Sequence, residues 1–188
     1  MTADNEIPSN GPDVDALASA VRVTADIIGG VPRGSGSTRT PCPDYDVDAL
    51  VTHLLGWAAN FADKVNGHEP PTEPGAVTLG TDPGMDYLIT GAQIVEGYRR
   101  GTHADALPLG VVLMETVTHG WDLARATGQP APYDDSSAEV ALAAGRSMLA
   151  PEYRGADKSF GLEVPVATTA PALDRLVAFM GRDPGWTP

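Results

Sequence analysis

Four long segments of this sequence repeat apolar residues at every third or fourth position, and this period limits the fold more than any other feature. The segments are residues 13–28, 46–66, 85–100 and 109–127. At about 3.6 residues per turn, such a repeat places the apolar side chains on one face of an α-helix. Loops rich in proline and glycine separate most of the segments. Amphipathic helices joined in this way bury their apolar faces against one another, so the pattern predicts a helical bundle.

The sequence after the fourth segment is less regular. Residues 136–149 and 171–180 have the spacing of two shorter helices, and residues 164–169 could pair as a small strand. We therefore expect an all-α fold, a four-helix bundle with a short C-terminal appendage. Residues 1–12 carry proline and glycine without a period, so we expect a flexible tail there and one helical-bundle domain over residues 13–188.

The charge balance excludes several classes of function. With 25 acidic and 12 basic side chains the chain carries a formal charge of −13, so nucleic acids and anionic membrane surfaces would repel it. No run of about 18 apolar residues is present to cross a bilayer. The first six residues lack the regions of a signal peptide, and a single cysteine excludes an internal disulfide and cysteine-rich zinc modules. We expect a cytoplasmic protein without nucleic-acid or membrane partners.

Two of the four histidines lie inside apolar helices, whereas His68 and His103 lie in loops, where solvated side chains are expected. Glu115 and His119 are four residues apart, so they project from one face of the helix at 109–127. That helix is apolar almost all round, and a buried carboxylate is unfavourable unless it is paired or bound to a metal. The pair could form a structural hydrogen bond, lie on a wide face that reaches solvent, or bind a metal.

His53 is the other histidine of this kind and lies on the flank of the apolar stripe of the helix at 46–66. A single histidine in such a position is commonly structural. If the two helix faces meet, however, His53, Glu115 and His119 supply two imidazoles and one carboxylate. This set suits zinc or a similar divalent ion and leaves a position open for water or substrate, which is typical of catalytic sites. The HExxH motif of metalloproteases is absent.

Four further residues have two interpretations each. Cys42 stands between two prolines just before the second helix, and it could be a reactive thiol near a helix N-terminus or a small buried side chain that fixes the loop. Asp122 follows His119 by three residues and could orient its imidazole, or it could be a cap or surface residue. Trp57 and Trp121 are expected in the core or in a pocket wall.

Three stretches of the sequence resemble a known family. The runs TPCPDY at residues 40–45 and LVTHLLG at 50–56 are similar to the second-helix segment of the DinB/YfiT-like superfamily. The closer resemblance is to metal-binding proteins similar to the N-terminal domain of mycothiol-dependent maleylpyruvate isomerase. Residues 115–128 resemble the second motif of that group, and residues 173–176 with 179–184 resemble its C-terminal signature. The three stretches together span nearly the whole chain.

The resemblance implies a helical bundle that holds a divalent metal, most simply zinc, through His53, Glu115 and His119. Relatives with known activity transfer or add low-molecular-weight thiols, and the metal lowers the pKa of the bound thiol. The resemblance therefore implies a metal-dependent S-transferase of the mycothiol type, with a small-molecule thiol and an electrophilic substrate as its partners. A non-catalytic metal- or ligand-binding protein and a metal-assisted hydrolase need the same three ligands and stay open as alternatives. We also expect a homodimer, since a small bundle often has apolar surface left to cover.

Overall fold

The computed structural model describes residues 11–74, 77–155, 158 and 160–188. Four long helices come first in the chain: α1 (Gly11–Gly29), α2 (Val47–Val65), α3 (Pro83–Arg100) and α4 (Leu109–Thr127). Two shorter helices follow, α5 (Asp135–Met148) and α6 (Ala172–Phe179). Two single 3₁₀ turns, η1 (Ala104–Ala106) and η2 (Pro151–Tyr153), lie between helices. The predicted all-α fold, a four-helix bundle with a short C-terminal appendage, is confirmed.

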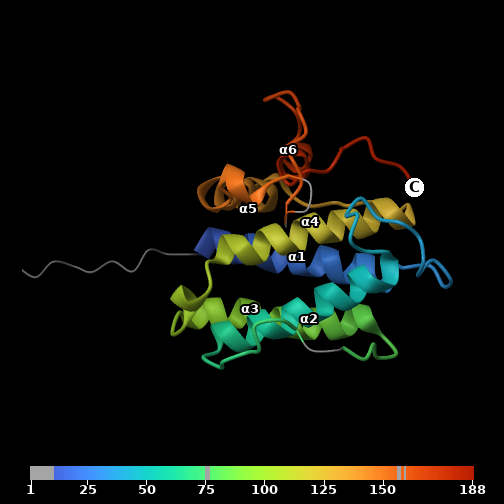
Figure 1. Ribbon diagram of the computed structural model, residues 1–188. Helices are drawn as coiled ribbons and strands as arrows, with labels where there is room; N and C mark the ends of the chain where they lie inside the picture. Colours follow the sequence, from blue (N-terminus) through green and yellow to red (C-terminus); the bar gives the residue numbers. More distant parts are fainter. Residues whose placement is uncertain (1–10, 75–76, 156–157, 159) are drawn as a thin grey trace, which may run out of the picture.

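The first four helices pack as a closed bundle (Figure 1). Helix α1 packs against α3 and α4, and α2 packs against the same two helices. Helix α5 adds to the bundle on α4 and α1, and α6 lies on α5 beside the C-terminal loops. The contact between α2 and α4 matters for function, because each of these helices carries candidate ligands.

Short-range signals explain where the helices begin and end. The carboxylates of Asp46, Asp82 and Asp134 each accept a hydrogen bond from the backbone N–H three residues further on. Each N-cap of this kind is worth about 1 kcal/mol. Helices α3 and α4 end at Gly101 and Gly128, whose φ angles of 70° and 68° are in the left-handed region that glycine adopts without strain.

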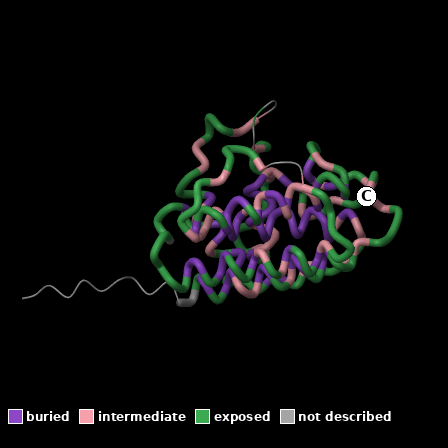
Figure 2. The backbone as a smooth tube through the Cα atoms, turned by 90° about the horizontal axis from the view of Figure 1, so that it is seen from below, coloured by how far each residue is buried: buried purple, intermediate pink, exposed green. Residues whose placement is uncertain are grey.

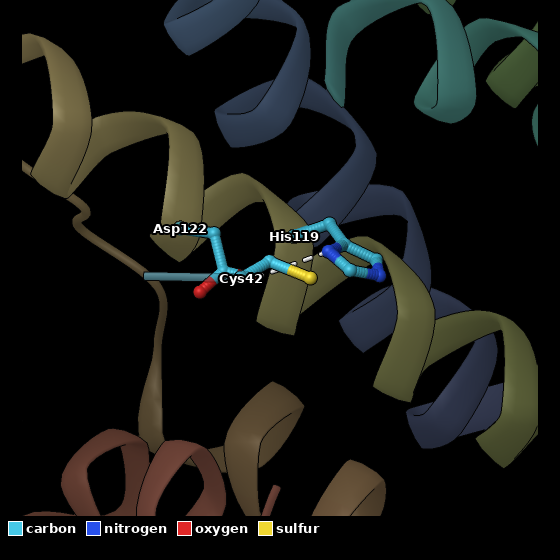
Figure 3. A group of neighbouring side chains, drawn as sticks. All are labelled: Cys42, His119 and Asp122. Atoms are coloured by element: carbon cyan, nitrogen blue, oxygen red, sulfur yellow. Dashed lines mark hydrogen bonds and ion pairs between the residues drawn. The ribbon is translucent and has the colours of Figure 1, made fainter. Parts of the chain in front are cut away.

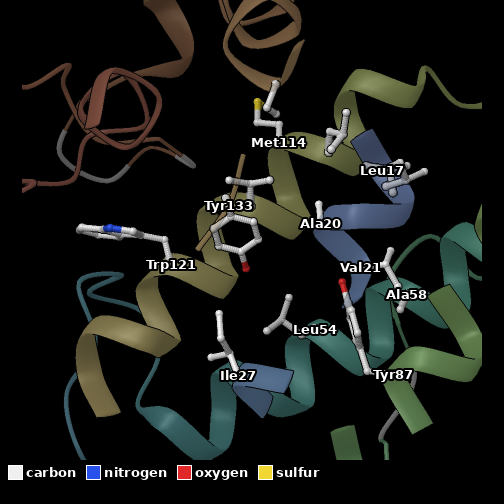
Figure 4. Packing of buried hydrophobic residues seen from close by; sticks show 14 of the residues in the cluster. Leu17, Ala20, Val21, Ile27, Leu54, Ala58, Tyr87, Met114, Trp121 and Tyr133 are labelled. Carbon is white, nitrogen blue, oxygen red and sulfur yellow. The ribbon is translucent and has the colours of Figure 1, made fainter. Parts of the chain in front are cut away.

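All six α-helices of the described residues contribute to one core of leucine, valine, alanine and a few aromatic side chains. The buried parts of the backbone follow the inward faces of the helices, and the exposed parts follow the outer faces and loops (Figure 2). Tyr87, Trp121 and Tyr133 are the large aromatic residues of the view in Figure 4. The Tyr133 hydroxyl lies 2.7 Å from the Thr24 hydroxyl, so this buried polar group is satisfied. A well-packed core of this kind fixes the relative positions of α2 and α4.

The structure differs from the sequence-based expectation in two places. Residues 164–169 do not pair as a strand, and the described residues contain only the isolated bridges Arg39–Asp46 and Arg154–Phe160. The segment instead runs along the end of α6, with one hydrogen bond from the Val164 N–H to the Ala178 carbonyl. Helix α1 begins at Gly11. Of the predicted tail at residues 1–12, residues 1–10 lie outside the described residues.

Helix length and polarity exclude a membrane span among the described helices. None of them combines enough length with enough apolar character to cross a bilayer.

Candidate metal centre

Helices α2 and α4 bring together the three residues that the sequence analysis singled out. His53 Nε2 lies 2.6 Å from Glu115 Oε1, and His119 Nε2 lies 3.4 Å from the same oxygen. One ligand atom from each residue lies within 4.8 Å of the others. The side chains are 15%, 24% and 11% exposed, so the group is largely buried but can be reached from one side.

Local structure explains why these side chains meet. Leu50 and Leu54 flank His53 by three and one positions and are buried in the core, which turns the flank of α2 that carries His53 toward α4. Glu115 and His119 are one helical turn apart, and both point to the same side of α4. Helix packing between α2 and α4 then closes the group.

A chain of hydrogen bonds continues behind His119. His119 Nδ1 lies 3.1 Å from Asp122 Oδ2, and the Arg182 guanidinium donates to both oxygens of that carboxylate, at 3.0 and 3.3 Å. Asp122 is fully buried. With the Nδ1 proton donated to Asp122, the lone pair of His119 is on Nε2, which faces Glu115. The lone pair and the carboxylate then face each other across 3.4 Å, an arrangement that favours a cation between them.

The electrostatics of the group follow from this arrangement. Burial raises the pKa of Glu115, but His119, His53 and Arg182 outweigh burial, so the pKa lies below its ordinary value. Burial lowers the pKa of His119, but the Glu115 and Asp122 carboxylates outweigh it, so that pKa lies above its ordinary value. The Glu115 carboxylate and the His119 imidazole thus favour each other's charged forms.

A second group of side chains shares His119 and consists of Cys42, His119 and Asp122 (Figure 3). Their ligand atoms also lie within 4.8 Å of one another. Arg182 already neutralises the Asp122 carboxylate, and burial raises the pKa of the Cys42 thiol to about 11, so the thiol is protonated at neutral pH. The Thr40 hydroxyl donates to the Cys42 carbonyl at 2.9 Å. These features support the interpretation of Cys42 as a small buried side chain that fixes its loop.

The three candidate ligands lie in the wall of a cavity of about 830 Å³. Tyr45 and Trp57 both lie beside His53, with ring centroids 4.6 and 6.3 Å from that of the imidazole. Trp57 is thus in a pocket wall, whereas Trp121 is in the core. The loop histidines His68 and His103 are exposed and outside the cavity.

Sequence reasoning missed two residues of this site. Tyr45 lies in the loop before α2, and Arg182 lies after α6. Both belong to stretches that resemble the family, and this resemblance is the signal that could have pointed to them. Neither stretch has a helical period that would have indicated where the side chain points.

The protein is thus a helical bundle in which two facing helices bring two imidazoles and one carboxylate to the wall of a cavity. The family model of the mycothiol maleylpyruvate isomerase N-terminal domain matches residues 17–109. The chain belongs to this DinB-like family. The match includes His53 and ends before Glu115 and His119.

Relatives extend the similarity over the rest of the chain. Two proteins of Mycobacterium tuberculosis, MT0763 of strain CDC 1551 / Oshkosh and Rv0738 of strain H37Rv, are each 32% identical over 186 residues. The alignment covers 89% of this chain and 92% of each relative, and both relatives are described as uncharacterized. No solved structure matches the chain significantly.

Proposed function

We propose that the protein binds one divalent metal ion, most simply zinc, through His53, Glu115 and His119. The observation that carries this proposal is the convergence of three ligand atoms from two helices at the wall of a cavity. Two imidazole nitrogens and one carboxylate oxygen are a set that zinc takes in sites with a fourth, open position. Membership of a mycothiol-related family supports the same assignment.

We propose further that the protein is a thiol S-transferase of the mycothiol type. A bound divalent ion supplies the Lewis acidity that keeps a ligated thiol deprotonated at neutral pH. We propose that the Glu115 carboxylate takes up the thiol proton as the sulfur replaces it at the metal, and that the Asp122–Arg182 pair holds His119 in one orientation. The sulfur would then form a bond with the electrophilic carbon of the second substrate while the bond from that carbon to its leaving group breaks, and the leaving group, chloride for monochlorobimane, departs with the bonding electrons. A cavity of about 830 Å³ is large enough for small-molecule ligands.

Two alternatives use the same three residues. A metal-assisted hydrolase would activate water in place of a thiol, and a non-catalytic protein would hold the metal or a ligand without turnover. The family description names a mycothiol-dependent isomerase, which favours thiol chemistry over both. Thiol chemistry also fits the cytoplasm, the compartment that we propose, because thiols are kept reduced there.

The test is a rate measurement with metal-loaded protein, mycothiol and the electrophile monochlorobimane. We expect conjugate to form faster than with thiol and electrophile alone, and we expect His119→Ala to abolish the difference. His68→Ala is the matched control, because His68 is an exposed loop histidine outside the cavity. A rate unchanged by the protein would support the non-catalytic alternative. Hydrolysis of monochlorobimane by the metal-loaded protein without thiol would support the hydrolase.

A further inference from the structure

The cavity beside the candidate ligands contains one buried polar side chain that is unsatisfied. Thr118 on α4 lines the cavity and is 1% exposed, and its hydroxyl has no hydrogen-bond partner in the described part of the chain. The other buried side chains of the lining that carry nitrogen or oxygen are bonded. Asn60 donates to a backbone carbonyl at 2.7 Å, and His119 and Arg182 are bonded to the same carboxylate, Asp122. Because buried polar groups are nearly always bonded, the Thr118 hydroxyl indicates a partner from outside the chain.

Two comparisons within the chain show that the Thr118 hydroxyl is unusual. The other buried atoms without a partner in the described residues belong to the guanidinium groups of Arg125 and Arg154, which donate to backbone carbonyls through other nitrogens and lie outside the cavity lining. A threonine on a helix commonly donates to the carbonyl four residues earlier, as Thr52 and Thr127 do. Thr118 makes no such bond, so its only donor stays available to a molecule in the cavity.

The position of Thr118 on α4 places it beside the candidate ligands. Thr118 follows Glu115 by three residues and precedes His119 by one. Side chains three residues apart are neighbours on a helix surface, with Cβ atoms about 5–6 Å apart. A ligand group that binds beside Glu115 therefore lies next to the Thr118 side chain as well.

The charges of the lining indicate which kind of group binds there. Arg182 is paired with Asp122, so Glu115 is the remaining buried carboxylate among the described residues of the lining. A divalent ion held by Glu115 would leave one positive charge uncompensated, which a singly charged anion at the open position would neutralise. The exposed charged residues at the rim are two basic and two acidic side chains: Lys64, Lys158, Asp44 and Glu73. They balance one another and leave the preference for an anion unchanged.

We propose that the Thr118 hydroxyl binds the singly charged anionic group of a ligand at the metal site, by donating a hydrogen bond to its charged atom. The inference rests on the proposed function, in which this atom is the thiolate sulfur. A hydrogen bond to a charged acceptor is about twice as strong as one between neutral groups, so it adds to the affinity for the ligand. Thr118 is thus a ligand-binding residue that contributes neither to the three metal ligands nor to the hydrogen bonds of the fold.

The test compares Thr118→Val with Thr116→Val in protein loaded with cobalt(II), whose absorption spectrum reports anion binding. Thr116 is the matched control, because it is buried on the same helix outside the cavity lining and its hydroxyl accepts a hydrogen bond from Tyr87. The probes are azide and 2-mercaptoethanol. We expect Thr118→Val to bind both about tenfold more weakly than the parent, and we expect Thr116→Val and Thr118→Ser, which keeps the hydroxyl, to bind like the parent. All variants should hold as much metal as the parent.

The outcomes separate this inference from the proposed function. Parent affinity for both probes in Thr118→Val, or equal losses in Thr116→Val, would overturn the role of Thr118 and leave the S-transferase standing. Weaker azide binding in Thr118→Val, with no thiol bound by any of the proteins, would support Thr118 and overturn the S-transferase. A metal-loaded parent that binds neither probe would overturn the inference, and its metal content would still support the metal site.

The stability of the metal-free chain gives a second readout that needs neither metal nor ligand. Thr118→Val replaces an unpaired buried hydroxyl with a methyl group, so the variant should unfold at the same denaturant concentration as the parent or at a higher one. Thr116→Val should unfold at a lower concentration, because the Tyr87 hydroxyl loses its partner. A Thr118→Val protein that is less stable than the parent, or does not fold, would show that the hydroxyl is needed within the fold and would overturn the inference.

Discussion

Arg182 lies 60 positions after Asp122 in the sequence, yet its guanidinium completes the hydrogen-bond chain behind His119. Asp122 is fully buried, and a buried carboxylate without a cation would be strongly unfavourable. Arg182 therefore keeps Asp122 ionised, and Asp122 in turn fixes the tautomer and orientation of the imidazole. The Nε2 lone pair of His119 is directed at Glu115 as a result.

Removing the Asp122 charge should weaken the proposed metal site. We expect Asp122→Asn to lower metal affinity about 10- to 100-fold, because the imidazole loses its charged partner. The variant should also lose about 3 kcal/mol of stability, since Arg182 is left buried without a counter-charge. Affinity is measured by competition with a chromophoric chelator. Parent affinity in a folded Asp122→Asn protein would contradict the positioning role.

The proposed metal site should also bind metal more weakly as the pH falls. The pKa of His119 lies above its ordinary value because the Glu115 and Asp122 carboxylates outweigh burial. Below that raised pKa a proton occupies the nitrogen that a metal needs, so apparent affinity decreases as the pH falls through it. In Asp122→Asn the same decrease should move to lower pH, because one of the two carboxylates is gone. Titrations at several pH values check this, and an affinity independent of pH would refute it.

The sequence predicts the direction of side chains on helices better than that of side chains in loops. The helical period alone places Glu115 and His119 on one face, and the apolar flank places His53 toward a partner helix. The sequence leaves two roles open for Asp122, because spacing along a helix does not show whether another side chain pairs with its carboxylate. Arg182 and Tyr45 could not be predicted in this way, because they lie in loops and no sequence period indicates where loop side chains point.

The positions of the helices along the chain can be predicted closely from the sequence. The fourth helix begins and ends as predicted, at Leu109 and Thr127. Aspartate caps explain where α2, α3 and α5 begin, and a glycine explains where α3 ends. The expected strand at residues 164–169 does not form. Pro165 has no N–H to donate, and no strand of the described residues pairs with this stretch, so it stays irregular.

The contact between α1 and α3 depends on Gly84. A Cβ added at this position would lie 2.7 Å from the Ala25 carbonyl oxygen and 2.8 Å from the Gly29 nitrogen, both backbone atoms that cannot move alone. We expect Gly84→Ala to destabilise the fold by about 1–3 kcal/mol in a denaturant titration. Gly29→Ala is the matched control, because its Cβ would meet only the Gly84 Cα at 4.0 Å. Equal stability of the two variants would show that the close approach is not limiting.

The Gly84→Ala variant is also a control for the predictions on metal affinity. It should lose stability and keep its metal affinity, because α1 and α3 carry none of the candidate ligands. Comparison with Asp122→Asn then separates a loss of positioning from general destabilisation.

For the whole molecule, the site joins parts of the chain that are far apart in sequence. The family match ends at residue 109, so the first three helices supply one proposed ligand and the remainder supplies two. The C-terminal segment closes over the site through Arg182, and Arg125 holds the carbonyls of Pro184 and Trp186. A ligand bound at this junction should stabilise the fold as a whole.

Metal removal should therefore lower the melting temperature. Binding to the native state alone adds about 4 kcal/mol when the metal is a thousandfold above its Kd. For a chain of this size that corresponds to a loss of about 10 °C on chelation. The chelator should leave the melting temperature of His119→Ala unchanged. If parent protein that has lost its metal melts at the same temperature as metal-loaded protein, the prediction that the metal stabilises the fold is wrong.

The metal content of purified protein tests the three proposed ligands most directly, by elemental analysis after zinc loading and gel filtration. We expect about one ion per chain in the parent and in the loop variants His68→Ala and His103→Ala. We expect that ion to be lost in His53→Ala and in His119→Ala. Equal metal in all five proteins, or none in the parent, would contradict the assignment of His53, Glu115 and His119 as ligands.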